Sequence, residues 1–494
     1  MRGDNTQNCG GSLQSGVIIM KRLLIDVLII LTMGFIPYSV YADGFTYTTI
    51  SYPDASSTYA NGIDGNNIVG FYSDASGTCH GFLYNGSTYT TIDYPATGHT
   101  VLNGIDGDNI VGSYKPDNTG SSHGFIYNAS TFTLLDVPGF KSTQALGIDG
   151  SNIVGYCYDD INIGIHHGFI YDGSTYKTFV INPNGHTLAY GIDGNNIVGH
   201  YQDGSGYHGF IYNGLTSITL DFPGAEFTSA HGIYGNNIVG EWDEENGNTH
   251  GFLYNGSTYI SLDFPGSGFT EANGIDGNNI VGVYHDGQTY RGFLATDTTP
   301  PSVTAFSIPK TSTSSTVSIA IFTASDNVGV TGYMVTNSFS APSADSSEWS
   351  VTPPVSFTFP STVKPGKNTL YAWAKDAAGN ISQPFSAMVT LRDITKPIVT
   401  AFSISSPSTS TTVSITAFSA TDNFEVTGYV VTRSFFPPFP NSSKWSVTPP
   451  VSFTFPSTVR SGTKILYAWA KDAAGHVSRP FSAKVTINLP STPR

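Results

Sequence analysis

Short runs rich in hydrophobic, aromatic and β-branched residues alternate with polar turns along most of the chain. In one stretch these runs are TYANGI, NNIVGFY, HGFLYN and STYTTIDYP, which begin at Thr58, Asn66, His80 and Ser87. Asp-Gly separates the first two runs and Asn-Gly the last two, and both dipeptides favour two-residue hairpin turns. The pattern therefore predicts a four-stranded antiparallel meander.

This stretch recurs six times. The string NGIDGNNIVG stands at 61–70 and 273–282, and variants of it begin at 103, 146, 190 and 231, with their first glycines 41 to 44 residues apart. Four short strands in such a period are typical of a β-propeller blade. The sixth repeat ends one strand short at RGFLAT, whereas DGFTYTTISYP, from Asp43, matches the missing strand. We therefore predict an all-β protein with a six-bladed β-propeller over 43–296, closed by its N-terminal strand.

The two recurring motifs, HGF followed by Leu or Ile and Tyr, and GIDG followed by NNIVG, resemble those of the HAF family of extracellular repeats of secreted bacterial proteins. The resemblance covers about 250 residues. It implies secretion and carries no activity. The last repeat departs from the family pattern, because Arg291-Gly292-Phe293 replaces His-Gly-Phe.

A longer repeat fills the C-terminal part. SDNVGVTGY at 325–333 corresponds to TDNFEVTGY at 421–429, and LYAWAKDAAG recurs at 370 and 466, an offset of 96 residues. That is the size of an immunoglobulin-like sandwich. The copies resemble bacterial Ig-like or fibronectin type III-like modules, and we predict two of them, at 297–394 and 395–490. Such tandem modules commonly space or attach another domain, so we expect spacers rather than binding sites.

The N-terminal segment has the features of an export signal. From Met20, the predicted true start, a basic Lys21-Arg22 pair precedes an apolar stretch, and a small-residue site ends at Ala42. We predict that residues 1–42 are a signal peptide and that the protein is secreted or held at the cell surface. Later segments are too short or too polar to cross a bilayer, so no membrane insertion is expected after cleavage.

Charge divides the chain unevenly and limits its partners. Residues 43–296 contain 25 acidic and 4 basic residues, a formal net charge of −21, whereas residues 297–494 carry +5. A nucleic-acid groove on the propeller is excluded, because nothing there would neutralise phosphates. An extracellular glycan or protein remains as partner, and we expect a monomer without a cofactor. Cys79 and Cys157 occupy non-equivalent repeat positions, so no disulfide between them is expected.

Residues that repeat are interpreted as scaffold. The Asp of GIDG, replaced once by Tyr234, suits a hairpin turn. A histidine begins the third strand of five repeats, and five blades would hold these residues too far apart for one metal ion. We predict instead a hydrogen bond repeated from blade to blade. The histidines are His80, His123, His167, His208 and His250.

Functional residues are then expected where the repeats differ. Two loops vary most, the loop after the second strand and the loop between blades, and a meander places both on one rim, as in a binding face on a rigid scaffold. Trp242 beside three acids suits stacking on a sugar, or it packs in its blade like Tyr72. Clustered acids could bind Ca²⁺, but no ordered ligand loop is visible and no metal set is assigned. The candidate site residues are Trp242, Asp243, Glu244, Glu245, Tyr158, Asp159, Asp160, His166, His99 and His186.

Three functions are compatible with this pattern. We favour a non-enzymatic binding or adhesion protein that presents the varied face to a glycan or protein. The alternative is a secreted propeller lyase or glycoside hydrolase in which His99, His186 or His231 with a nearby acid serves as acid/base pair. A structural surface component without a discrete ligand is the third.

Overall fold

The computed structural model describes residues 39–42 as backbone, and residues 44–96, 98–116, 120–128, 130–159, 164–360 and 363–489 in full. Across these ranges the protein is all-β, with 39 strands and no helix. No helix among them could therefore span a membrane. The chain forms two compact units, one reaching Thr299 and including Asn327–Gly329, the other made of the remaining C-terminal residues. Most of the predicted signal segment lies outside the described residues.

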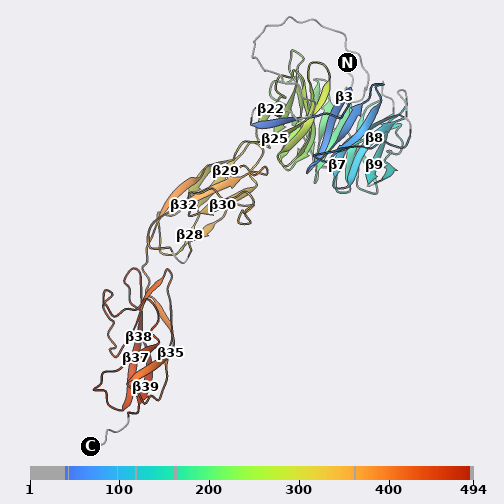
Figure 1. Ribbon diagram of the computed structural model, residues 1–494. Coiled ribbons are helices and arrows are strands. Elements are labelled where there is room, and N and C mark those ends of the chain that lie inside the picture. The colour runs from blue at the N-terminus through green and yellow to red at the C-terminus, as the bar shows by residue number, and fades with distance from the viewer. Residues whose placement is uncertain are drawn as a thin grey trace, which may run out of the picture. The chain divides into compact units, whose positions relative to one another are not determined.

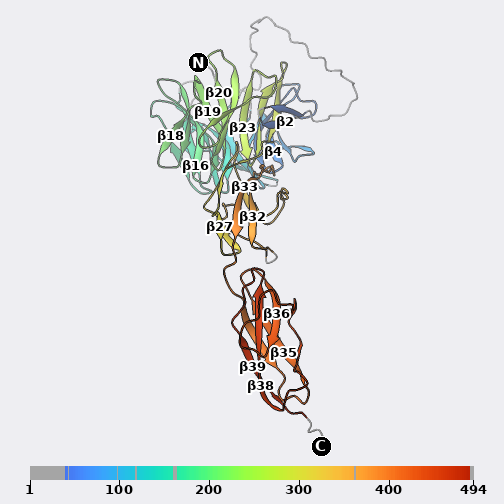
Figure 2. The ribbon, with the colours of Figure 1, turned by 90° about the vertical axis from the view of Figure 1, so that its left-hand side faces the viewer.

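The first unit consists of six antiparallel meanders in a propeller-like arrangement (Figures 1 and 2). We number these blades 1 to 6 in chain order. Blade 1 comprises β3 (Ser57–Asp64), β4 (Asn67–Ser73), β5 (Cys79–Tyr84) and β6 (Tyr89–Thr91); blade 2 comprises β7 (His99–Asp106), β8 (Asn109–Lys115), β9 (His123–Asn128) and β10 (Thr131–Leu134); blade 3 comprises β11 (Ser142–Asp149), β12 (Asn152–Tyr158), β13 (His167–Tyr171) and β14 (Tyr176–Phe179).

The later blades repeat this order. Blade 4 comprises β15 (Thr187–Asp193), β16 (Asn196–Gln202), β17 (Tyr207–Tyr212) and β18 (Ser217–Leu220); blade 5 comprises β19 (Phe227–Tyr234), β20 (Asn237–Asp243), β21 (Thr249–Tyr254) and β22 (Tyr259–Leu262); blade 6 begins with β23 (Thr270–Asp276), β24 (Asn279–His285) and β25 (Tyr290–Asp297).

The N-terminal strand supplies the missing strand of blade 6, as predicted. β2 (Phe45–Ile50) pairs antiparallel with β25, from Phe45 opposite Asp297 to Ile50 opposite Gly292. β1 (Ser39–Ala42), from the predicted signal segment, pairs with the other edge of β2. No sheet closes on itself into a barrel, but the first strands contact one another in the order β3, β7, β11, β15, β19, β23, and β23 contacts β3.

The first glycine of NGIDG is explained by the approach of neighbouring blades. A Cβ atom on Gly62 would lie 2.7 Å from the carbonyl oxygen of Asn103 in blade 2. The five equivalent glycines would also meet a carbonyl oxygen of the next blade, at 2.5–3.0 Å. A side chain at any of these positions would push two first strands apart, so the motif repeats because the blades touch there.

The recurring Asp does more than form a turn, which corrects the prediction. The turn itself is centred on Gly65, with φ +56°, and Asn66, and it joins the paired residues Asp64 and Asn67. The Asp64 carboxylate accepts a hydrogen bond of 2.7 Å from the backbone N–H of Gly107 in blade 2. The same bond recurs from Asp106 to Gly150, Asp149 to Gly194, Asp193 to Gly235 and Asp276 to Gly65, at 2.5–2.7 Å. We call these bonds the aspartate latches; the Asp276 latch joins blade 6 to blade 1.

The histidine series was predicted wrongly, because its bonds lie within blades. His80 Nδ1 is 2.8 Å from Asp93 Oδ2 in the same repeat. The equivalent pairs His123–Asp136, His208–Asp221 and His250–Asp263 are separated by 2.8–2.9 Å. In blade 6, Arg291 replaces the histidine and Ser51 replaces the aspartate. Arg291 Nη1 donates a hydrogen bond to Ser51 Oγ at 2.9 Å, so the contact is kept although both residues differ. These bonds tie the third strand to the segment that leaves the fourth.

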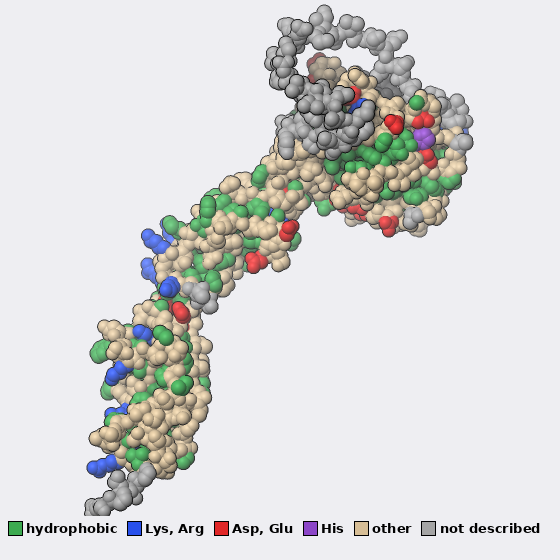
Figure 3. Space-filling view, in the orientation of Figure 1, with side chains coloured by type: hydrophobic (Ala, Val, Ile, Leu, Met, Phe, Trp, Pro, Cys, Tyr) green, Lys and Arg blue, Asp and Glu red, His purple; other side chains and the backbone are tan. Residues whose placement is uncertain are grey.

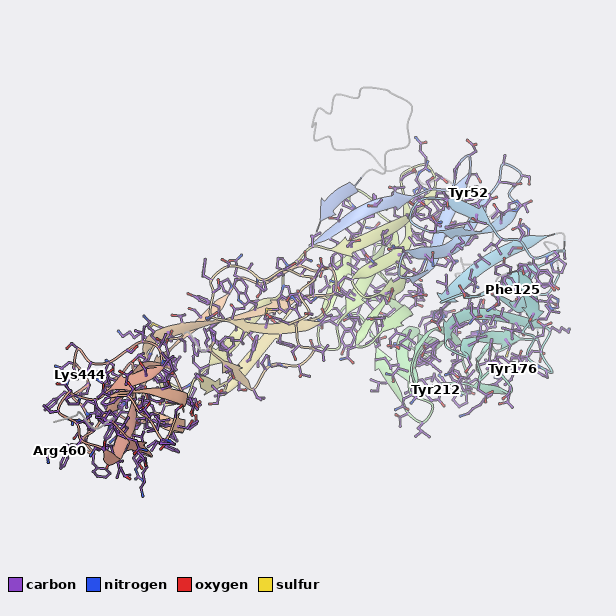
Figure 4. The ribbon with its side chains drawn as sticks, turned by 60° about the horizontal axis from the view of Figure 1, so that its bottom comes forward. Tyr52, Phe125, Tyr176, Tyr212, Lys444 and Arg460 are labelled. Atoms are coloured by element: carbon purple, nitrogen blue, oxygen red, sulfur yellow. The ribbon has the colours of Figure 1, made fainter. Side chains whose placement is uncertain are left out.

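Aromatic side chains fill the propeller. The Phe of each third strand is fully buried, and Tyr52 stacks on Tyr72 with ring centroids 3.7 Å apart. Figure 4 labels Tyr52 in blade 1 and Phe125 in blade 2. Burying a phenylalanine side chain contributes about 1.5–3 kcal/mol, so this position is a main source of blade stability. The six residues are Phe82, Phe125, Phe169, Phe210, Phe252 and Phe293.

The second unit contains two β modules of similar construction. In each, buried side chains from separate sheets share one hydrophobic core, and Trp373 and Trp469 are fully buried at equivalent positions. The first module comprises β26 (Ser302–Ser307), β27 (Thr311–Ser312), β28 (Thr316–Ser318), β29 (Ile321–Ser325), β30 (Gly332–Thr336), β31 (Ser356–Thr358), β32 (Gly366–Lys375) and β33 (Phe385–Leu391); the second comprises β34 (Ile398–Ile404), β35 (Thr412–Thr421), β36 (Val426–Thr432), β37 (Ser452–Thr454), β38 (Gly462–Asp472) and β39 (Phe481–Ile487).

Candidate ligand-binding site

The two varied loops adjoin in blades 1 and 5, as predicted. The backbone N–H of Ser56, before the first strand of blade 1, donates to Ser73 O at the end of its second strand. In blade 5 the N–H of Glu226 donates to Asp243 O at 3.2 Å. These loops therefore share one rim of the propeller, which we call the varied rim. Figure 3 shows acidic side chains on the surface of the propeller.

Trp242 occupies the packed position of its blade. Its ring stacks on Phe222, with centroids 4.2 Å apart and planes 3° apart, and also on His250, with centroids 4.6 Å apart. Tyr72 stacks in the same way on Tyr52 and His80 in blade 1. The geometry favours the packing interpretation of Trp242 over a sugar-stacking platform.

The predicted acids of the varied rim do not converge. Asp243 accepts a hydrogen bond from Thr249, Glu244 accepts one from Asn246, and Glu245 is exposed, as is Asp159 in blade 3. Asp160 lies outside the described residues. Within the described part of the propeller unit, no three His, Cys, Asp or Glu residues place ligand atoms within 4.8 Å of one another. The described rim acids therefore form no preformed Ca²⁺ site.

Of the predicted histidines, two lie together. His166 and His186 have ring centroids 4.7 Å apart, and the Tyr158 ring lies tilted beside His166 with its centroid 4.7 Å away. His186 Nδ1 accepts a hydrogen bond from the backbone N–H of His166. His99 lies in a different part of the propeller, where its Nδ1 accepts a hydrogen bond from the backbone N–H of Cys79. The structure thus unites Tyr158, His166 and His186 and separates them from His99.

A larger polar cluster, which was not predicted from the sequence, lies on the first two strands of the blades. Cross-strand pairs next to the conserved positions change from blade to blade. They are Tyr59–Phe71, Val101–Ser113, Gln144–Tyr156, Leu188–His200, Ser229–Glu241 and Glu271–Val283. The residue before the NGIDG glycine varies too, being Asn61, Asn103, Leu146, Tyr190, His231 and Asn273.

Blades 4 to 6 concentrate titratable groups at these positions. His231 Nε2 lies 3.7 Å from Glu241 Oε1, and its Nδ1 is 3.0 Å from Asn273 Oδ1 of the next blade. Glu241 in turn shares a hydrogen bond with Glu271 of blade 6. Two carboxyl groups so bonded must hold a proton between them, because two carboxylates repel.

The cluster continues into blade 4. His200 Nδ1 lies 2.9 Å from Ser229 Oγ, and Tyr190 contacts the rings of both His200 and His231, with centroids 5.5 and 4.8 Å away. Tyr156 reaches His166 at 5.3 Å. We call this group the inner array; it comprises Tyr59, Gln144, Tyr156, His166, His186, Tyr190, His200, Ser229, His231, Glu241, Glu271 and Asn273.

Burial keeps the histidines of the inner array neutral and favours the protonated form of Glu271. It lowers the pKa of His200 to about 3 and the pKa values of His231 and His166 to about 4, with nearby histidines adding to the shifts of His200 and His166. Burial also raises the pKa of Glu271 to about 7. Neutral imidazoles both donate and accept hydrogen bonds, and a protonated carboxyl does the same.

Two groups of the inner array are buried without a partner. Gln144 Nε2 and His166 Nε2 have no hydrogen-bond partner among the described residues. An unsatisfied buried polar group costs about 1–3 kcal/mol, and such groups in native structures are commonly completed by water or a ligand. Tyr59, Glu271, His166 and His186 are partly exposed and give access to the array.

The array could have been found by aligning the repeats. The Thr58 position is Thr in all six blades and the Ala60 position is Ala in five, whereas the residue between them and the residue after Ala60 change character from blade to blade. Differences in loop length are more conspicuous in the sequence than single substitutions inside strands. The sequence indicates His231 as an acid/base candidate, and His231 does lie beside an acid, Glu241.

No family model and no curated protein matches the sequence. Among solved structures, a six-bladed β-propeller lectin from Aleuria aurantia is 14% identical and covers 50% of this chain and 97% of its own, with a TM-score of 0.35. The SapL1 lectin in complex with α-methyl fucoside is 12% identical over 49% and 96%, with a TM-score of 0.32. The β-propeller domain of the trilobed protease of Pyrococcus furiosus is 9% identical over 47% and 98%, with a TM-score of 0.30. At these values none of the three carries an inference about a ligand.

Proposed function

We propose that this chain is an exported glycan-binding protein whose six blades form a closed propeller and bind a neutral saccharide at the inner array. The two C-terminal modules, which resemble Ig-like domains in length and core, act as its spacer. The basic, apolar and small-residue order before Asp43 supports export. The aspartate latch from blade 6 to blade 1 supports ring closure.

One observation carries the binding proposal. Uncharged groups that both donate and accept hydrogen bonds, together with tyrosine rings, gather at the strand positions that differ between otherwise matching blades. Saccharide hydroxyls need such paired donors and acceptors, and their ring faces pack on aromatic side chains. A propeller charge of −21 disfavours an anionic polysaccharide.

The Glu241–Glu271 pair does not have the spacing of a glycoside hydrolase's two catalytic carboxyl groups. The two carboxyl groups of such enzymes are separated by about 5–5.5 Å or about 6.5–9.5 Å. Glu241 and Glu271 share a hydrogen bond and therefore lie closer than either distance. The pair suits recognition of a hydroxyl better than attack on a glycosidic bond.

A glycan array probed with the full chain tests this proposal, followed by calorimetric titration of the best neutral saccharide. The variants take residues from the protein's own repeats. Glu271→Val introduces the blade 2 residue Val101, and His231→Asn introduces the residue of blades 1, 2 and 6. Each should weaken binding at least tenfold, about 1.4 kcal/mol, because a buried partner of the ligand is lost.

Ser113→Ala is the matched control, since Ser113 occupies the Glu241 position in blade 2, away from the acids. It should bind like the wild type. Absence of saccharide binding by the wild type, or equal binding by Glu271→Val and His231→Asn, would contradict the proposal.

A further inference from the structure

We propose that the second C-terminal module holds a Ca²⁺ ion between Asp393, Asp422 and Asp472. Asp393 lies in the segment that enters the module before β34, Asp422 follows β35, and Asp472 ends β38. Ligand atoms of Asp393, Asp472 and His476 all lie within 4.8 Å of one another. Three segments far apart in sequence thus bring metal-ligating side chains to one place.

Two carboxylate oxygens at this place are buried without a partner. Asp393 Oδ2 and Asp422 Oδ1 each expose less than 1 Å² and accept no hydrogen bond from the part of the chain that the structure describes. The Asp472 side chain is wholly buried. Burying a charged oxygen without a partner costs more than the roughly 1–3 kcal/mol of a neutral group, so the arrangement requires a counter-charge.

Among the described residues, no Lys or Arg side chain supplies that counter-charge. Among the ion pairs of the described residues, Asp472 contacts His476 at 2.9 Å, and none joins Lys or Arg to Asp393, Asp422 or Asp472. The carboxylates of Asp393 and Asp472 also lie near the carboxylate of Asp422, and like charges repel one another. A cation between the three carboxylates would remove this repulsion.

The internal repeat indicates which ion fits. At an offset of 96 residues, Asp297, Asp326 and Asp376 correspond to the three carboxylates, and Asn380 corresponds to His476. The carboxylates are common to both repeats while the fourth residue changes. Oxygen ligands alone favour a hard cation, and Ca²⁺ accepts irregular sets of six to eight oxygens that include water.

A cavity provides the ion with access. Asp422 lines a cavity of about 290 Å³ together with Asn423, Phe424 and residues of the first module, including Thr358 and Pro360. Water in this cavity can complete the coordination that three carboxylates leave open. The bound ion would fix the entering segment to the turns that follow β35 and β38.

Calcium titration of the full chain, followed by calorimetry and by sensitised Tb³⁺ luminescence, tests the site. Asp422→Asn and Asp393→Asn should each remove one bound equivalent, or weaken it at least tenfold, with the circular dichroism spectrum unchanged. Glu425→Gln is the matched control, because Glu425 is an exposed acid three residues from Asp422. It should bind as the wild type does.

Asp393→Asn keeps the proposal testable if Asp422→Asn fails to fold, since Asp393 precedes the first strand of the module. The assignment is overturned if the wild type binds no Ca²⁺ at millimolar concentration, or if both variants retain its stoichiometry and affinity. Preference for Zn²⁺ over Ca²⁺ would overturn the oxygen site in favour of one centred on His476.

Discussion

Blades 2 and 5 share a backbone and differ in their interiors. Both bury the phenylalanine of the third strand. In both, a threonine of the first strand accepts a hydrogen bond from an equivalent backbone N–H: Thr100 from Tyr94 in blade 2, and Thr228 from Phe222 in blade 5. At the inner positions blade 2 carries Val101, Asn103 and Ser113, whereas blade 5 carries Ser229, His231 and Glu241. The comparison separates positions that build a blade from positions that are free to acquire a ligand.

The strongest test of this separation removes the shared phenylalanine. Phe125→Ala and Phe252→Ala should each lower the free energy of unfolding by about 3–5 kcal/mol, because both side chains are fully buried. Chemical denaturation monitored by fluorescence measures the loss. A much smaller cost in blade 5 would show that the two blades are not equivalent scaffolds.

The pH dependence of stability distinguishes the interiors. The pKa values of His166, His200 and His231 are lowered to about 3–4, so the unfolded chain binds protons that the folded chain does not, and stability rises from about pH 4 to 6.5. Glu271 has the opposite sign, because its raised pKa means that the folded chain retains a proton between about pH 4.5 and 7. Unfolding free energies measured across this range should therefore rise, and rise more steeply in Glu271→Gln. An unchanged slope in the variant would contradict the buried carboxyl pair.

Exchanging the interiors tests where recognition resides. A triple variant, Ser229→Val, His231→Asn and Glu241→Ser, gives blade 5 the inner residues of blade 2. We expect at least a tenfold loss of saccharide affinity with little change in melting temperature, since the latches and the core are untouched. Calorimetric titration measures the first and scanning calorimetry the second. If the triple variant keeps its saccharide affinity, the ligand must bind elsewhere, and the varied rim becomes the candidate site.

The five aspartate latches should contribute equally to stability. Asp106→Ala and Asp193→Ala each remove a charged acceptor from a glycine N–H of the next blade. Each should lower the free energy of unfolding by about 0.5–1.5 kcal/mol, the net value of one hydrogen bond, because the latches are exposed to solvent. Equal losses in denaturant titrations would confirm a common scaffold role, whereas no loss would leave the carboxylate as a turn residue.

Much of this separation could be predicted from the repeats alone. The strand order and the completing N-terminal strand follow from period and hairpin signals, because those depend on local backbone chemistry. The partners of Asp64 and His80 could not, since repetition shows that a residue is structural and not which blade it contacts. Trp242 illustrates the same limit: beside three acids it resembles a sugar platform, and only the positions of Phe222 and His250 show that its ring is engaged.

Tyr234 offers the smallest and most specific test, because it breaks the latch series. It stands where the other blades have Asp and is 49% exposed, so a carboxylate there would meet the backbone of Gly277 as Asp193 meets Gly235. Tyr234→Asp should raise the free energy of unfolding by about 0.5–1.5 kcal/mol, the net value of one hydrogen bond. Tyr234→Ala controls for loss of the ring and should give no gain. Denaturation of the two variants side by side measures the difference, and equal stability would mean that blades 5 and 6 are joined without the latch.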